Sequence, residues 1–159
     1  MKLIVGIGDM KISSRPGDIL VTHALGSCLG VVVHDPCSKV AGLLHVMLPL
    51  SKINPEKAQA NPCMFVDTGV PAFFREVYAA GGAKSRLIVK VAGGAEVSDN
   101  TNGGFEIGRR NYVVLRKIFW KNGILIDAED VGGRCPRTLS MQVDTGRVWL
   151  SVDGMRREL

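Results

Sequence analysis

The sequence has no apolar run long enough to cross a membrane. Spanning a bilayer takes about 20 consecutive apolar residues, and no stretch of this chain approaches that length. The apolar run at residues 3–7 is also too short for a signal peptide. We therefore expect a cytoplasmic protein that is not inserted in a membrane.

Closely paired cysteines are also missing. No C-x-x-C pair occurs among the four cysteines, Cys28, Cys37, Cys63 and Cys135. So few cysteines, scattered over 159 residues, do not form a disulfide framework. The three histidines, His23, His34 and His45, are equally spaced but have no cysteine or carboxylate at a zinc-ligand spacing. The sequence predicts reduced thiols, no metal and no cofactor.

Aromatic residues are few, and the basic residues are dispersed. Phe, Trp and Tyr make up 6% of the chain, and the formal net charge is +5. Nucleic-acid binding usually needs clustered basic residues, often with aromatic residues among them. We therefore expect no nucleic-acid partner, although the positive charge favours an acidic protein surface.

Short β-branched runs separated by turn residues dominate the pattern. They predict strands at residues 3–7, 19–25, 29–35, 40–47, 87–92, 124–131, 138–143 and 148–152. Three prolines predict a long loop at residues 48–62, and glycines predict a polar connection at residues 93–104.

Two helices are expected between these strands. Asn61 and Pro62 resemble an N-cap followed by proline at the first helical position, and helical spacing continues to Gly81. A second helix is expected at about residues 109–122. This order predicts a single domain over residues 1–159 with an α/β (α+β-like) fold, in which layered, mixed, largely antiparallel sheets pack with two long helices.

Cys28 lies where one predicted strand ends and the next begins, between Gly26 and Gly30. A catalytic cysteine needs thiolate character and a backbone open to substrate, and backbone N–H groups at such a corner can bind an oxyanion. A buried, inert cysteine is the alternative, because free cysteines are usually buried.

His45 lies on an apolar strand that can pair with the strand following Cys28. An imidazole there would accept the thiol proton and later protonate a leaving amine. Thr22 precedes the cysteine turn and is a candidate to orient the imidazole through its hydroxyl or carbonyl group. Both residues are also compatible with purely structural roles.

Two further motifs have weaker signals. Gly93-Gly94-Ala95 follows a predicted strand but lacks the lysine of a P-loop and the third glycine of a dinucleotide fingerprint. Asn111, near the start of the second helix, is interpreted as part of the rim of the site, a position suited to contact with an anion or a carboxamide.

Six short motifs, in this order, give the chain its resemblance to a known family. They are Leu25-Gly26-Ser27-Cys28, Gly42-x-x-His45 followed by Leu48-Pro49, Gly93-Gly94-Ala95, Ile107-Gly108-x-x-Asn111, Asp130-x-Gly132-Gly133 and Asp144-Thr145-Gly146. Together they resemble the CheD family of chemoreceptor glutamine deamidases.

The resemblance implies an enzyme that converts glutamine side chains on the cytoplasmic helices of chemotaxis receptors to glutamate, with release of ammonia. It assigns the catalytic Cys, His and Thr to Cys28, His45 and Thr22. It also implies binding to the CheC phosphatase and a fold similar to deamidases of the cytotoxic necrotizing factor type.

Other readings remain open at this point. The acyl-enzyme would also accept a glutamate methyl ester, so methylesterase activity is chemically possible. The alternatives are a non-catalytic adaptor that binds CheC and receptor, and a cysteine protease, for which the short chain offers little peptide cleft. Lys52 and Lys57 in the proline-containing segment are predicted to contact an acidic receptor surface.

Overall fold

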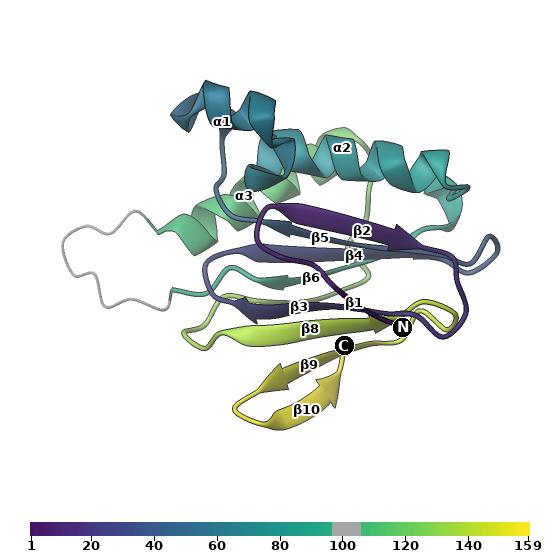
Figure 1. Ribbon diagram of the computed structural model, residues 1–159. Coiled ribbons are helices and arrows are strands. Elements are labelled where there is room, and N and C mark those ends of the chain that lie inside the picture. Colours follow the sequence, from purple (N-terminus) through teal and green to yellow (C-terminus); the bar gives the residue numbers. More distant parts are fainter. Residues whose placement is uncertain (97–105) are drawn as a thin grey trace.

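Two five-stranded sheets lie face to face, and helices cover the outer face of one of them (Figure 1). The computed structural model describes residues 1–96 and 106–159. The sheet that the helices cover is called the middle sheet below. The sheet on its other face is called the outer sheet.

The outer sheet has the order β1 (Lys2–Ile4), β3 (Ile19–Leu25), β8 (Arg137–Gln142), β9 (Val148–Val152) and β10 (Met155–Glu158). The middle sheet has the order β2 (Asp9–Ser13), β5 (Val40–Val46), β4 (Leu29–Asp35), β6 (Ile88–Gly93) and β7 (Ala128–Val131). Among the strands described, β1–β3 and β6–β7 are parallel pairs, and the other neighbours are antiparallel. The helices are α1 (Pro55–Ala60), α2 (Val66–Ala79) and α3 (Ile107–Lys121).

Strands β4 and β5 are buried along their whole length because the middle sheet is covered on both faces. Alternate residues therefore enter two different cores. Val31 and Leu44 pack with α2 and α3, whereas Val32 and Leu43 pack against the outer sheet. This explains why both strands are nearly continuous apolar runs in the sequence.

The predicted α+β-like class, with mixed and largely antiparallel sheets, is confirmed. The strands expected around residues 19–25, 29–35, 40–47, 87–92, 138–143 and 148–152 are present within two residues of their predicted ends, and the helix expected at about 109–122 is α3. Similarity to cytotoxic necrotizing factor deamidases and the single-domain organisation stay predictions.

The predicted loop at residues 48–62 was wrong. This segment contains the short 3₁₀ turn Ser51–Ile53 and helix α1. A second 3₁₀ turn, Pro62–Met64, begins at its last residue. Helix α1 starts because the Asn54 side chain accepts a hydrogen bond from the Lys57 N–H and Pro55 occupies the first turn.

The start of the first long helix was also misplaced. Asn61 is an N-cap followed by proline, as predicted, but the element that it caps is the 3₁₀ turn Pro62–Met64. Phe65, the next residue, has an extended backbone, so α2 begins only at Val66. Local capping signals therefore identified the turn but not the residue at which the long helix starts.

At the edges of the sheets, two strand predictions need correction and two strands were missed. The strand predicted at residues 3–7 ends at Ile4, and the one predicted at 124–131 begins at Ala128. Strands β2 and β10 were missed, because β2 has only two apolar residues and is nowhere fully buried, and β10 is exposed throughout. Asp153 and Gly154, both with positive φ, form the tight turn into β10.

Two remaining expectations concern particular segments. Most of the glycine-rich connection predicted through Gly104 lies outside the described residues. In the part of the chain that the structure describes, no helix is long and apolar enough to cross a membrane.

Candidate active site

Cys28, His45 and Thr22 come from three neighbouring segments at one end of the two sheets. Cys28 lies in the turn by which the chain passes from β3 in the outer sheet to β4 in the middle sheet. His45 is in β5 and Thr22 is in β3. Cys28 is half-buried, and His45 and Thr22 are buried.

Cys28 and His45 share one face of the middle sheet. Strands β4 and β5 are antiparallel neighbours, as the sequence predicted, and their register places Gly30 opposite His45. Cys28 precedes Gly30 by two residues, so its side chain has the same orientation relative to the sheet. A Cβ on Gly30 would meet Leu25 and Leu139, which shows that this face points toward the outer sheet. The thiol and the imidazole are thus diagonal neighbours, with backbones about 7–8 Å apart.

Thr22 holds the imidazole from the opposite sheet. Its Oγ1 lies 2.7 Å from His45 Nδ1, and its hydroxyl also donates to the carbonyl oxygen of Val5 at 2.7 Å. A hydroxyl has one proton, so if that proton goes to Val5, Oγ1 must accept from His45 Nδ1–H. In this tautomer Nε2 carries a lone pair. His45 Nε2 is buried and has no hydrogen-bond partner among the described residues.

Burial favours the uncharged form of both the Cys28 thiol and the His45 imidazole. Desolvation lowers the pKa of His45 to about 4. The same effect raises the pKa of the Cys28 thiol, opposed by a hydrogen bond with its own backbone N–H. Near pH 7 the resting pair is therefore a neutral thiol and a neutral imidazole, and not an ion pair.

The carbonyl groups of Gly26, Ser27 and Cys28 each accept a hydrogen bond from residues 94–95 or from α3. Gly26 O accepts from Ala95 N–H at 2.8 Å, Ser27 O accepts from Asn111 Nδ2 at 2.9 Å, and Cys28 O accepts from Gly94 N–H at 2.8 Å. Among the described residues, the N–H groups of Ser27 and Cys28 have no backbone acceptor. The turn therefore has fixed peptide planes and two N–H groups free of backbone partners.

Glycine is required where residues 93–95 contact this turn. Gly93 has φ +112°, and a Cβ at this position would lie 2.2 Å from Cys28 O. Gly108 at the start of α3 is also close to this segment, since a Cβ there would lie 2.5 Å from Gly94 O. In this structure, the Gly93-Gly94-Ala95 motif supports the backbone that carries Cys28.

Asn111 is not a rim residue, contrary to the sequence-based interpretation. Its side chain is completely buried, and Nδ2 donates both to Ser27 O and to Met47 O at 3.0 Å. Asn111 Oδ1 is buried without a partner in the described part of the chain. One amide thus ties the cysteine turn to the end of the strand that carries His45.

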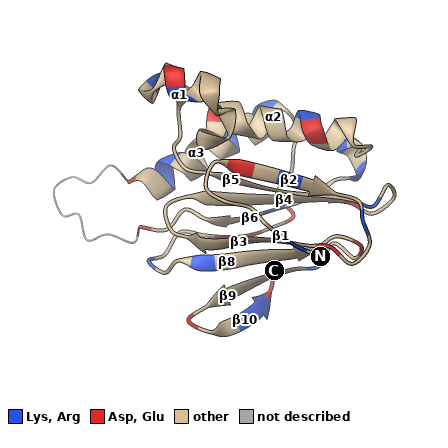
Figure 2. Ribbon diagram, in the orientation of Figure 1, with Lys and Arg blue, Asp and Glu red and all other residues tan. Residues whose placement is uncertain are grey.

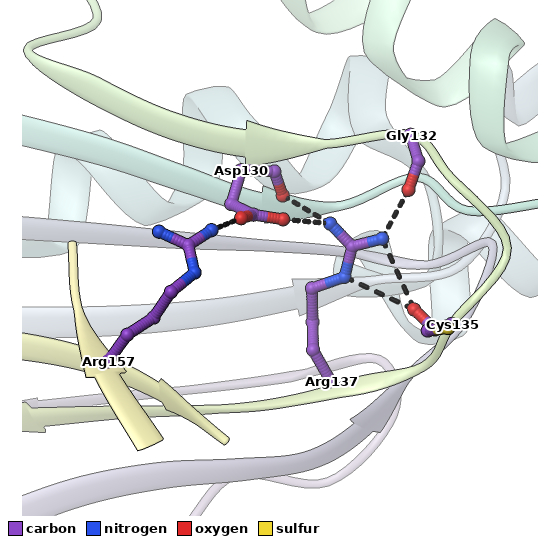
Figure 3. A network of polar contacts seen from close by, with 5 residues as sticks. All are labelled: Asp130, Gly132, Cys135, Arg137 and Arg157. Atoms are coloured by element: carbon purple, nitrogen blue, oxygen red, sulfur yellow. Dashed lines mark hydrogen bonds and ion pairs between the residues drawn. The ribbon is translucent and has the colours of Figure 1, made fainter. Parts of the chain in front are cut away.

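The Arg137 guanidinium binds the end of β7 and the loop that follows it through several hydrogen bonds (Figure 3). It is 5% exposed and donates to the carbonyl oxygens of Asp130, Gly132 and Cys135 and to the Asp130 carboxylate, which also pairs with Arg157. Buried arginine is tolerated because these acceptors satisfy its donors.

The loop held by Arg137 contacts the support of the cysteine turn. Gly132 N–H donates to Gly93 O, and Glu96 N–H donates to Gly133 O, both at 2.9 Å. Arg137 also lies opposite Leu25 in the β3–β8 ladder, beside the irregularity between Thr22 and Leu25. The loop held by the network in Figure 3 therefore contacts the segment that supports the cysteine turn.

Sequence analysis did not assign Val5 or Arg137 to the site. Val5 contributes only a carbonyl group, which no side-chain pattern reveals, and Arg137 gave no motif signal beyond its position after Pro136. No group of three or more His, Cys, Asp or Glu side chains able to hold a metal ion occurs among residues 1–96 and 106–159.

Comparison with known proteins identifies the family. A family model described as CheD chemotactic sensory transduction matches residues 47–152. "Probable chemoreceptor glutamine deamidase CheD 1" of Syntrophus aciditrophicus (strain SB) is 50% identical over 158 residues, covering 99% of this chain and 98% of that protein. "Probable chemoreceptor glutamine deamidase CheD" of Solibacter usitatus (strain Ellin6076) is 44% identical over 99% of this chain and 93% of that protein.

A more divergent relative extends the comparison. "Probable chemoreceptor glutamine deamidase CheD" of Thermococcus kodakarensis is 37% identical over 93% of this chain and 91% of that protein. These matches extend over nearly the full length of both chains, and the family model covers well over half of this one. The chain therefore belongs to the CheD family.

Proposed function

We propose that this protein is a cysteine-dependent glutamine deamidase that acts on chemotaxis receptors in the cytoplasm. The names of its relatives support the reaction and the substrate class. The observation that carries the assignment to residues is the buried His45 Nε2, which has no partner within residues 1–96 and 106–159 while Thr22 occupies Nδ1. Cys28 is the nucleophile, His45 the general base and acid, and Thr22 the residue that orients His45.

In the first step, His45 Nε2 accepts the Cys28 thiol proton as the sulfur attacks the carboxamide carbon of glutamine. The imidazole is suited to accept this proton because its lowered pKa keeps it neutral. The carbonyl oxygen becomes an oxyanion, and the N–H groups of Ser27 and Cys28 stabilise it.

In the second step, the C–N bond breaks and His45 returns the proton to the departing amine, which leaves as ammonia. A thioester to Cys28 remains. His45 then accepts a proton from water, the resulting hydroxide attacks the thioester carbon, and the C–S bond breaks. Protonation of sulfur restores the thiol, so one amide and one water yield one carboxylic acid and one ammonia.

The supports described above account for the precision that this chemistry needs. Gly94, Ala95 and Asn111 orient the peptide groups from Gly26 to Cys28, and Asn111 also ties Met47 to the same turn. An oxyanion site is effective when its donors are fixed before reaction. Asn111 is thus a positioning residue in this proposal.

Mass spectrometry of a receptor cytoplasmic fragment tests the proposal. Each deamidation adds about 1 Da, since an amide NH₂ is replaced by OH. We expect this gain with the wild-type protein and with Cys37→Ala and Cys135→Ala, which change exposed thiols, but not with Cys28→Ala. Gain with Cys28→Ala would remove Cys28 from the mechanism.

The same experiment separates the enzyme from an adaptor that binds CheC and receptor without chemistry. If the wild-type protein binds the receptor fragment and no glutamine gains mass, the adaptor function replaces the deamidase. Binding to purified CheC is part of the proposal in both cases, and a titration by calorimetry measures it.

Methylesterase activity is a second reaction open to the same acyl-enzyme. A glutamate methyl ester would lose methanol instead of ammonia in the second step and then give the same carboxylate. We expect Cys28-dependent methanol release from a methylated receptor fragment. Methanol release by Cys28→Ala at the wild-type rate would contradict a shared mechanism.

A further inference from the structure

The outward side of α3 is a basic surface with two exposed apolar residues. This surface, called the α3 face below, consists of Arg109, Arg110, Val113, Arg116, Lys117, Trp120 and Lys121, all of which are exposed. Their spacing of three, four and seven residues places them on one side of the helix. Figure 2 shows lysine and arginine along this helix.

The charge of the α3 face has one sign. Helix α3 contains five lysines and arginines and no acidic residue, while the whole chain has a formal net charge of +5. Arg109 lies 3.9 Å from Glu106, and Arg116 donates to the Tyr112 hydroxyl. Arg110, Lys117 and Lys121 have no ion-pair partner among the described residues.

This charge is not explained by the helix itself. The first turn of a helix favours acidic residues because the macrodipole is positive there. In α3 that turn has no acidic residue and carries Arg109 and Arg110. Glu106 and the Glu96 carboxylate, which accepts the Arg109 N–H, offset the charge of Arg109. Arg110 has no ion-pair partner among the described residues, so its charge is unfavourable for the helix and points to a role outside the folded chain.

The apolar part of the face favours a protein partner. Val113 is 42% exposed and Trp120 84% exposed, and they lie seven residues apart, which is the repeat at which one helix contacts another. A membrane surface would instead need a broad apolar face, and in α3 that face, with Leu115 and Phe119, is buried in the core.

Helix α3 also begins at the candidate active site. Gly108 packs on Gly94, and Asn111 holds Ser27 beside Cys28. From there the helix extends roughly 20 Å away from the cysteine turn, given a rise of about 1.5 Å per residue. A partner lying along α3 thus has one end next to Cys28.

We infer that the α3 face is the docking surface for an acidic α-helical segment, the one that carries the target glutamine. This inference rests on the proposed function and adds the surface that selects the substrate. Its cations attract the acidic side chains, and Val113 and Trp120 supply the apolar contact.

Two helical peptides with one glutamine each provide the test, one with glutamates and one with lysines around the glutamine. A short neutral glutamine peptide reports on chemistry alone. We compare the wild-type protein with the variant Arg110→Glu/Lys117→Glu/Lys121→Glu. The matched control is Lys2→Glu/Lys39→Glu/Arg75→Glu, which changes the net charge equally at exposed sites outside α3.

The α3 variant should raise KM for the acidic peptide about 10- to 100-fold, the effect of reversing three exposed charges, with kcat and turnover of the neutral peptide unchanged. The control variant should change KM only slightly, and the lysine peptide should be a poor substrate for the wild-type protein. Equal loss in both variants, or equal KM for both helical peptides, would overturn the inference. A neutral variant with glutamine at the three α3 positions should have a KM for the acidic peptide between those of the wild type and the charge-reversed variant.

A binding measurement separates this inference from the proposed function. In a Trp149→Phe background, Trp120 fluorescence should shift to shorter wavelength when the acidic peptide binds. If the wild-type protein deamidates no peptide but the shift occurs, the docking surface stands and the proposed function fails. If Trp120 fluorescence shifts with anionic phosphatidylserine vesicles or with duplex DNA but not with the acidic peptide, the α3 face binds a lipid surface or nucleic acid, and the inference of an acidic protein helix is overturned.

Discussion

The hydroxyl oxygen of Thr22 lies 2.7 Å from His45 Nδ1, although the two residues belong to different sheets. Strand β1 completes the arrangement, since Val5 beyond its end accepts the Thr22 proton. The tautomer of one imidazole therefore depends on the packing of three separate chain segments. This dependence makes the site testable with conservative substitutions.

Thr22→Val should lower kcat because it keeps the shape of the side chain but removes the acceptor for Nδ1–H. The loss of an oriented hydrogen bond corresponds to roughly ten- to hundredfold in rate. Thr22→Ser keeps the hydroxyl and should retain most activity. Steady-state deamidation of a receptor fragment checks both variants, and full activity of Thr22→Val would show that Thr22 does not position His45.

Cys28 should react slowly with iodoacetamide at pH 7, because burial raises the pKa of its thiol. Cys37 and Cys135 are exposed and serve as internal references in the same protein. Mass spectrometry of peptides at increasing pH should show Cys28 modified last, with a rate that rises in the alkaline range. Modification of Cys28 before the exposed thiols at pH 7 would indicate a resting thiolate–imidazolium pair.

His45 should make the folded protein less stable in acid. Its pKa is about 4 in the folded protein against 6.5 for the ordinary group, so between these values the unfolded chain binds a proton that the folded protein does not. Stability from this group is fully present above pH 6.5 and falls as the pH drops toward 4, by on the order of 3 kcal/mol. Denaturant unfolding of the wild type and His45→Gln should show a smaller pH slope in the variant.

His34 is the control for that measurement, because burial also lowers its pKa. It lies away from Cys28 and bonds to Val143 O at 3.1 Å. His34→Gln should reduce the pH slope in the same direction without changing the acid limb of activity. An unaltered slope in His45→Gln would mean that the pKa of the His45 imidazole is the same in the folded and the unfolded chain.

Gly93→Ala should be more harmful than Gly132→Ala. Both glycines have positive φ, +112° and +89°, so alanine costs about 1–2 kcal/mol of backbone strain at either position. Only at Gly93 would the added Cβ also collide with the cysteine turn, 2.2 Å from Cys28 O. Unfolding and activity measurements should give a clear excess loss for Gly93→Ala, and equal losses would show that the turn can move aside.

Asn111→Asp should be worse than Asn111→Ala for activity, although it is closer in shape. Aspartate would place an oxygen against Ser27 O and Met47 O, where Asn111 now donates. Alanine only leaves those carbonyls without a donor, at a cost of about 1–3 kcal/mol each if they stay dry. Single-turnover rates and unfolding curves measured for both variants check this order, and wild-type rates in Asn111→Asp would exclude a positioning role.

Local patterns in the sequence determined most strands, helix α3 and the position of Cys28. β-branched runs and turn residues act over a few neighbouring positions, and so they predicted β3, β4, β5, β8 and β9 without knowledge of the rest of the chain. The same short range explains the errors: the Asn61–Pro62 signal marked a turn, while the start of α2 depended on Phe65 entering the core.

The pairing of His45 with the strand after Cys28 was also predictable, because the two strands are consecutive and the turn between them is short. Only the tertiary structure decided the surroundings of these residues. The contact from Thr22 to Val5 spans 17 residues, and that from Asn111 to Ser27 spans 84. Such contacts form when the two sheets and α3 pack together, and burial then changes the pKa of the Cys28 and His45 side chains that the sequence had placed.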